Sequence, residues 1–186
     1  MPKTLIKTLT AQPSAYLEFV DGASDVVFDN TYPVYEFHYV NMHPATYGNF
    51  EFQVNATDDA GGGYDTSLIT STYSRAEHRE TGAGGNFAYS GGNDQSNTAD
   101  FAKLIHGVDD EAYDSCSGIL TIYDPSSTTY IKHFLARTNA THHTAEYSMD
   151  AFTGGYISDT TAIDEIRVKF SSGNIDSGTI KMFGVS

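Results

Sequence analysis

Apolar and polar side chains alternate along several short runs of this chain, and this two-residue period strongly constrains its fold. In the clearest run, NFEFQVN, the apolar residues Phe50, Phe52 and Val54 occupy every second position. Successive side chains of a strand point to opposite faces of a sheet, so such a run has one buried and one wet face. The pattern predicts an antiparallel sheet with Glu51 and Gln53 facing water.

Other runs with strand character follow along the chain, separated by turn residues. They cover residues 15–20, 26–28, 34–40, 67–75, 98–106, 116–123, 129–137, 143–152 and 162–185. Residues 116–137 predict a hairpin, and Gly154 and Gly155 predict a turn. The last run is divided by polar turn residues at 171–178, which predicts a closing β-hairpin.

The sequence therefore predicts an all-β fold, an antiparallel β-sandwich of the jelly-roll kind with about nine to eleven strands. Its aromatic content of 13%, all Tyr and Phe, fits strands better than helices. A length of 186 residues predicts one domain covering residues 1–186. Two Gly-rich loops interrupt the pattern, at residues 58–65 and at Gly82–Asn97, and the length of the second indicates either a function or disorder.

The formal charge of −14 is unevenly distributed, because no Lys or Arg occurs between Thr8 and Ser74. Such a surface repels phosphate, so we expect neither a nucleic-acid partner nor binding to an anionic membrane. The N-terminal residues lack the apolar run of a signal peptide, and no stretch approaches a membrane span. We expect a protein made in a cytoplasm.

Two acidic clusters in predicted loops are candidates for calcium, which prefers six to eight oxygen ligands. Neither cluster has the spacing of a known calcium loop, and Asp-rich turns also form for backbone reasons alone. We therefore predict no metal or other cofactor, and keep the clusters as weak calcium candidates. Their residues are Asp58, Asp59, Asp65, Asp109, Asp110 and Glu111.

The remaining reactive side chains do not form a recognisable catalytic motif. Cys116 has no His within a few positions to lower its pKa, so we interpret it as a small packing residue. His142 and His143 are neighbours that would point to opposite faces of a strand, which disfavours a shared metal. We expect no catalytic residues and no enzymatic activity. The Tyr-rich faces suit sheet packing or a subunit interface, and sugar stacking is the alternative.

Residues 160–184 form the distinctive run TTAIDEIRVKFSSGNIDSGTIKMFG. It resembles the ending of small virion proteins of tailed bacteriophages, often marine, whose pattern is roughly aI-d-Irf-fssGNIasGtIklyG. YVNMHPAT at residues 39–46, FEFQV at 50–54 and TDDAGG at 57–62 resemble a strand, turn, strand and TDgG loop of such proteins. The chain departs from them at Met182 and Phe183, where Leu-Tyr is frequent, and at the Asp59-Ala60 interruption.

The resemblance implies a structural virion protein, most simply a capsid decoration or cement protein on the particle exterior. Its partners would be other virion proteins, namely the major capsid protein or tail components, and further copies of itself. The alternative is a tail-associated receptor- or carbohydrate-binding protein that recognises a host-surface glycan, with the Gly82–Asn97 loop as a lip. The resemblance assigns no catalytic residue.

Overall fold

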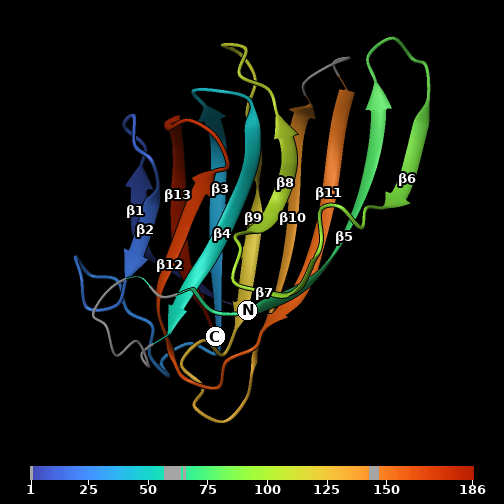
Figure 1. Cartoon of the computed structure of the whole chain (residues 1–186). Coiled ribbons are helices and arrows are strands. Elements are labelled where there is room, and N and C mark those ends of the chain that lie inside the picture. The colour runs from blue at the N-terminus through green and yellow to red at the C-terminus, as the bar shows by residue number, and fades with distance from the viewer. Residues whose placement is uncertain (1, 57–63, 65, 143–146) are drawn as a thin grey trace.

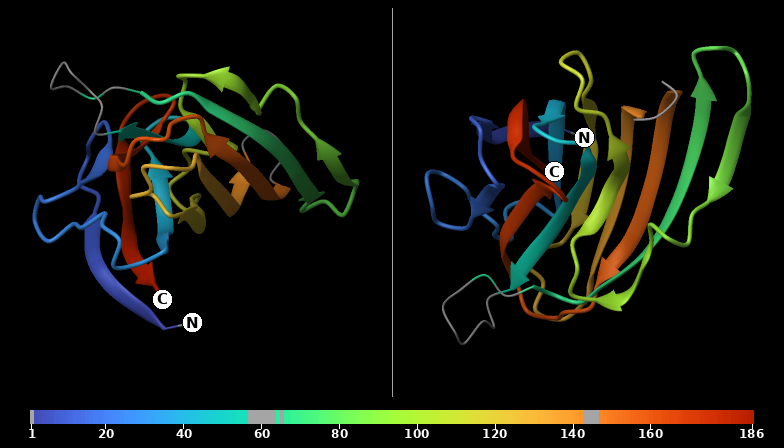
Figure 2. Two further views of the ribbon diagram at one scale, coloured as in Figure 1. Left: turned by 90° about the horizontal axis from the view of Figure 1, so that it is seen from below. Right: turned by 45° about the horizontal axis from the view of Figure 1, so that its top comes forward.

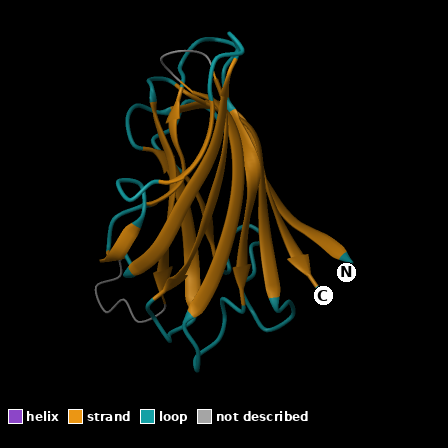
Figure 3. Ribbon diagram, turned by 90° about the vertical axis from the view of Figure 1, so that its right-hand side faces the viewer, coloured by secondary structure: helices purple, strands orange, loops and turns teal. Residues whose placement is uncertain are grey.

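The computed structural model describes residues 2–56, 64, 66–142 and 147–186, and these contain strands and loops but no helix (Figures 1 and 3). The all-β prediction is confirmed. The strands are β1 (Lys3–Thr10), β2 (Leu17–Val20), β3 (Val34–Pro44), β4 (Gly48–Ala56), β5 (Ile69–Arg79), β6 (Gly85–Tyr89), β7 (Gln95–Thr98), β8 (Ala102–Val108), β9 (Cys116–Tyr123), β10 (Lys132–His142), β11 (Tyr147–Ile157), β12 (Ile163–Phe170) and β13 (Ile175–Val185).

These strands form one antiparallel sheet that folds over into two layers and is nearly closed (Figures 1 and 2). The large sheet has the order β1-β13-β3-β9-β10-β11-β5, with β6 and β7 both pairing with β5. The small sheet has the order β8-β4-β12-β2. The layers join where Val108 of β8 pairs with His142 of β10.

A two-stranded ribbon wraps across both layers, as in a jelly roll. β3 pairs with β13 in the large sheet, and their continuations β4 and β12 pair in the small sheet. At the corner, the Ala45 amide donates to the Asn174 carbonyl at 2.9 Å, and the Ser171 amide donates to the Asn49 carbonyl at 2.9 Å. The two segments that carry the resemblance therefore pack together although they are far apart in the sequence.

The inner faces of the two layers meet in an aromatic core, because each layer contributes the apolar half of its alternating strands. Rings from the small sheet contact rings from the large sheet at centroid distances of 5.0–5.3 Å. The pairs are Phe19 with Phe37, Phe50 with Tyr39, and Phe52 with Phe134. The hairpin predicted over residues 116–137 is confirmed by the pairing of β9 with β10.

The predicted closing hairpin is wrong. β12 pairs with β2 and β4, whereas β13 pairs with β1 and β3, so residues 171–174 carry the chain from one layer to the other. The predicted turn at Gly154 and Gly155 is also wrong, because both residues lie inside β11. A side chain at Gly155 would overlap the Thr70 carbonyl and approach Phe134 Cζ to 2.9 Å, so glycine serves close packing there.

Thirteen strands are described, more than the nine to eleven predicted. The sequence does not predict β1, and β6 and most of β7 form within the region expected to be the Gly82–Asn97 loop. Conversely, residues 26–28 are not a strand. Ser24 and Asp25 before them have positive φ angles of 50° and 71°, and the Phe28 amide donates to the Asp21 carboxylate instead of to a neighbouring strand.

Candidate functional site

Exposed apolar side chains gather on the outer face of the large sheet, which we call the apolar face. The strand register places them on one side, since residues directly opposite in neighbouring strands share a face. One row runs from Leu5 through Phe183, Glu36, Thr121 and Leu135 to Gly154. A second runs from His38 through Ile119, Arg137, Phe152 and Ser74 to Tyr89.

Exposed large hydrophobic side chains are concentrated on the apolar face. In the described part of the chain, fifteen large hydrophobic side chains are exposed, and eight of them belong to the apolar face. Single exposed apolar residues are ordinary, but a contiguous group marks an interaction surface. The eight are Leu5, Val40, Phe87, Tyr89, Ile119, Tyr123, Leu135 and Phe152.

A groove of about 500 Å³ lies in the middle of the apolar face. Gly154 contributes no side chain there, and the Leu135 and Phe152 side chains supply large apolar parts of the groove lining. Arg137 borders the groove: it binds Asp150 through Nη2 at 2.7 Å and lies over the Phe152 ring at 4.9 Å. The guanidinium is thus held in place beside an apolar hollow that another molecule can fill.

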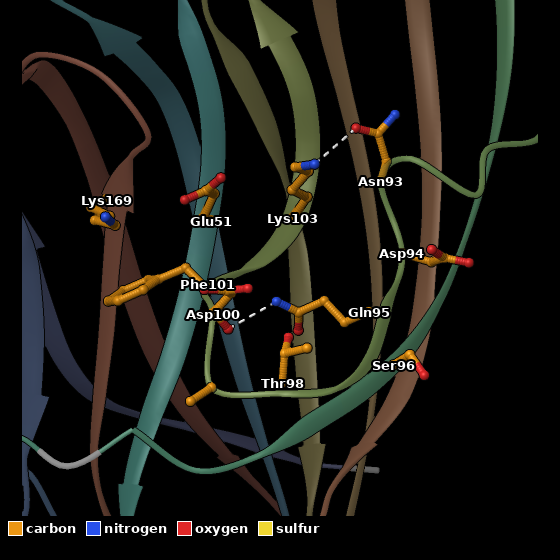
Figure 4. A pocket seen from close by; sticks show the side chains of 11 residues that line it. Glu51, Asn93, Asp94, Gln95, Ser96, Thr98, Asp100, Phe101, Lys103 and Lys169 are labelled. Carbon is orange, nitrogen blue, oxygen red and sulfur yellow. Dashed lines mark hydrogen bonds between the residues drawn. The ribbon is translucent and has the colours of Figure 1, made fainter.

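The outer face of the small sheet is different, because it carries a polar cavity of about 510 Å³ (Figure 4). Three charged residues form a row across its floor, in which Glu51 of β4 is paired with Lys169 of β12 and with Lys103 of β8. Figure 4 shows Glu51 between the two lysines. The segment that bounds the cavity supplies Asn93, Asp94, Gln95, Ser96, Thr98, Ala99, Asp100 and Phe101.

Neither lysine forms an ion pair with Glu51 among the described residues. Lys103 Nζ donates to the Gly92 carbonyl and to Asn93 Oδ1, both at 3.1 Å. Lys169 Nζ lies 4.4 Å from the centre of the Phe101 ring. Because both lysine ammonium groups make their contacts away from Glu51, the space between the three charged groups stays open.

Glu51 is buried, with 8% of its surface exposed, and the one hydrogen bond of its carboxylate within the described residues is a long one of 3.4 Å from Asn49 Nδ2. Burial raises the pKa of this carboxyl, while Asn49 and the two nearby lysines act in the opposite direction. A buried carboxylate with so few donors is poorly compensated, so it favours a ligand that donates hydrogen bonds.

The prediction that Glu51 and Gln53 face water is wrong, because residues 98–101 fold over this side of β4. Gln53 is fully buried, and its Nε2 donates to the carbonyls of Ser67, Ala99 and Asp100 at 3.0–3.1 Å. The alternation of the sequence identifies two faces of a strand, but it does not reveal that a distant segment covers the polar one. The polar cavity was therefore missed, although its rim falls partly in the long loop singled out from the sequence.

The calcium candidates are not assembled into a site by the described residues. Asp58, Asp59 and Asp65 lie outside these residues. Asp109 is buried and its Oδ1 accepts a hydrogen bond from the Asp110 amide at 2.8 Å, while Asp110 and Glu111 are exposed. In the described ranges, no group of three or more His, Cys, Asp or Glu side chains is placed to hold a metal ion.

The other reactive side chains are parts of the packing. Cys116 is buried in the core, and burial raises the pKa of its thiol. His142 stacks on Tyr147 with ring centres 4.5 Å apart, and its ring centre is 5.1 Å from that of His106. His143 lies outside the described residues.

In the ranges that the structure describes, no apolar helix is long enough to cross a membrane. Comparison of the chain with protein-family models, with curated proteins and with solved structures finds no match.

Proposed function

We propose that this chain is a structural protein of a tailed-bacteriophage particle, most simply a decoration or cement protein on the outside of the capsid. The observation that carries the proposal is the apolar face, where eight large hydrophobic side chains are exposed on one side of one sheet. A β-sandwich normally presents polar side chains on its outer faces, so this face is suited to be covered by another protein. In this role the chain provides a binding surface and catalyses no reaction.

The resemblance to phage virion proteins supports the same assignment. Its two segments form one structural unit at the corner of the ribbon, where Ala45 bonds to Asn174 and Asn49 bonds to Ser171. The net charge of −14 favours the exterior of a capsid over the side that faces packaged DNA, because like charges repel.

The partner we propose for the apolar face is the major capsid protein. Leu135 and Phe152 would insert apolar surface into the contact, and Arg137 is already oriented beside them for hydrogen bonds at the edge of the groove. Aromatic and Arg side chains around a hollow are the usual anchors of protein interfaces.

Immunogold labelling of purified parent particles with antibodies against this chain tests the location. Labels spread over the capsid surface are expected, labels on the tail would favour the second function below, and particles without label would reject a virion role. Rebinding to particles that lack the chain tests the face itself. Leu135→Glu should weaken rebinding by about tenfold or more, whereas Tyr113→Glu, a control at a side chain that is 77% exposed and off this face, should not.

Rebinding unaffected by Leu135→Glu would show that the capsid contact lies elsewhere. If that variant instead separates a soluble oligomer into monomers, the apolar face is a contact between copies of this chain.

The second candidate function is a tail-associated protein that binds a receptor or a carbohydrate. The polar cavity favours it, because Asn93, Asp94 and Gln95 of the long loop region form part of its wall, as a lip around a ligand would.

A further inference from the structure

We propose that the polar cavity above Glu51 is a binding site for a neutral saccharide. This inference deepens the second proposed function, and it is independent of the capsid role because the cavity and the apolar face lie on the outer faces of different layers. The cavity volume of about 510 Å³ falls within the range of small-molecule sites and is sufficient for a small sugar.

The charges around the cavity select against ionic ligands. The acidic side chains Glu51, Asp94 and Asp100 line it, so a phosphate or a carboxylate would meet like charge. Lys103 and Lys169 flank Glu51 on both sides, so a metal ion at that carboxylate would also meet like charge. A neutral ligand that hydrogen-bonds is repelled by neither set.

The hydrogen-bond donors and acceptors of the cavity narrow the class of ligand further. Lys103 already donates to Gly92 and Asn93, whereas the Glu51 carboxylate accepts only the long hydrogen bond from Asn49 within the described part of the chain. A sugar hydroxyl donates to a carboxylate and accepts from an ammonium with the same oxygen, so vicinal hydroxyls can bridge Glu51 and Lys169. Such a ligand compensates the buried carboxylate without adding charge.

Recognition would rest on hydrogen bonds rather than on ring stacking. Phe101 lines the cavity, but Lys169 lies over its ring, and the Tyr64 ring is nearly parallel to it at 6.5 Å. Without an open aromatic platform the affinity for a single sugar should be weak, in the millimolar range, and should depend strongly on Glu51.

The test is a titration of the ¹⁵N-labelled full chain, followed by amide chemical shifts, with glucose, galactose, mannose and N-acetylglucosamine added one at a time. At least one sugar should shift amides around Glu51, Lys103 and residues 93–101 and leave those of the apolar face unchanged. Glu51→Gln preserves the size of the side chain but removes its charge, and it should weaken that binding about tenfold. Glu80→Gln, at an exposed position outside the cavity, is the matched control and should bind like the parent chain.

Lys169→Met is the second variant should Glu51→Gln fail to fold, and it should also weaken binding. The proposal is overturned if none of the four sugars shifts the cavity amides, or if the folded variants bind as tightly as the parent chain. It is equally overturned if calcium chloride or sodium phosphate, titrated in parallel, shifts those amides and the sugars do not. Immunogold labels on the capsid combined with sugar binding would reject the tail location and leave the saccharide site standing.

Discussion

The Arg75 guanidinium donates a hydrogen bond from Nη1 to Nε2 of His106 at 2.7 Å, so this imidazole is held as a neutral acceptor. Burial lowers the pKa of His106 to about 4, with further contributions from the positive charge of Arg75 and from His142 and Lys103. Tyr73 completes its surroundings, with its hydroxyl 3.0 Å from His106 Nδ1.

This arrangement predicts a loss of stability in acid. The folded state binds a proton on His106 more weakly than the unfolded state, whose pKa is near 6.5, so the stabilising contribution is complete above pH 6.5 and lost as the pH falls toward 4. The loss should be on the order of 2 kcal/mol. Chemical unfolding across this pH range measures it, and His106→Gln should flatten the curve. An equally steep curve in that variant would assign the acid sensitivity to another group.

The environment of Glu165 predicts a pH dependence of stability opposite to that of His106. Its carboxyl is 3.2 Å from Arg167 Nη2, yet burial and the neighbouring Glu18 carboxylate raise its pKa to about 7. Its contribution to stability is complete below about pH 4.5 and is lost as the pH rises through 7, because folding then buries a charged group. Glu165→Gln should raise the free energy of unfolding at pH 8 by on the order of 1–2 kcal/mol and have little effect at pH 4. Glu80→Gln, at an exposed position, is the control and should change neither value.

The close packing around Gly155 predicts that a single added methyl group will strongly destabilise the fold. An alanine Cβ there would overlap the Thr70 carbonyl and lie 2.9 Å from Ser71 Cα, both backbone atoms of the paired strand that cannot easily move. Gly155→Ala should lower the free energy of unfolding by about 3 kcal/mol or more. Gly92→Ala is the matched control, because nothing lies within 4 Å of its Cβ position. Similar midpoints for both variants in urea would contradict the close packing of β5 against β11.

The hydrogen bonds of Gln53 predict that one side chain holds the segment that covers the outer face of the small sheet. Gln53→Met retains the length but leaves the carbonyls of Ser67, Ala99 and Asp100 without this donor. We expect a loss of about 2 kcal/mol in unfolding free energy, together with faster amide exchange in residues 95–101. Gln12→Met removes a side-chain amide that is exposed and donates to the neighbouring Ala11 carbonyl, and this change should alter neither quantity. Unchanged exchange in residues 95–101 would show that Gln53 does not hold this segment.

The buried side of each long strand could be predicted from the sequence, whereas the partners of the strands could not. Phe50, Phe52 and Val54 alternate with polar residues and are buried as predicted, because the period of a strand is a local property. The polar residues 171–178 are equally compatible with the loop of a hairpin and with a corner between layers. The choice depends on β2, β3 and β4, which lie far away in the sequence.

The apolar face and the polar cavity also differ in how far the local sequence predicts them. Leu135 and Phe152 alternate with buried residues, so their exposure on the wet side of a strand follows from local pattern once the register is known. The polar cavity depends on residues 93–101 crossing above Glu51, a contact between segments more than forty positions apart that no local period encodes.

The position of β13 between β1 and β3 has a consequence for the order of events during synthesis. Residues 175–185 leave the ribosome after both neighbouring strands, so β1 cannot join the large sheet and β3 waits with an open edge until then. An open edge of this kind pairs readily with other chains, and pairing of distant strands is slow. Assembly of this part of the large sheet should therefore wait for residues 175–185 to be synthesised, and nascent chains stalled before them should depend on chaperones to stay out of aggregates.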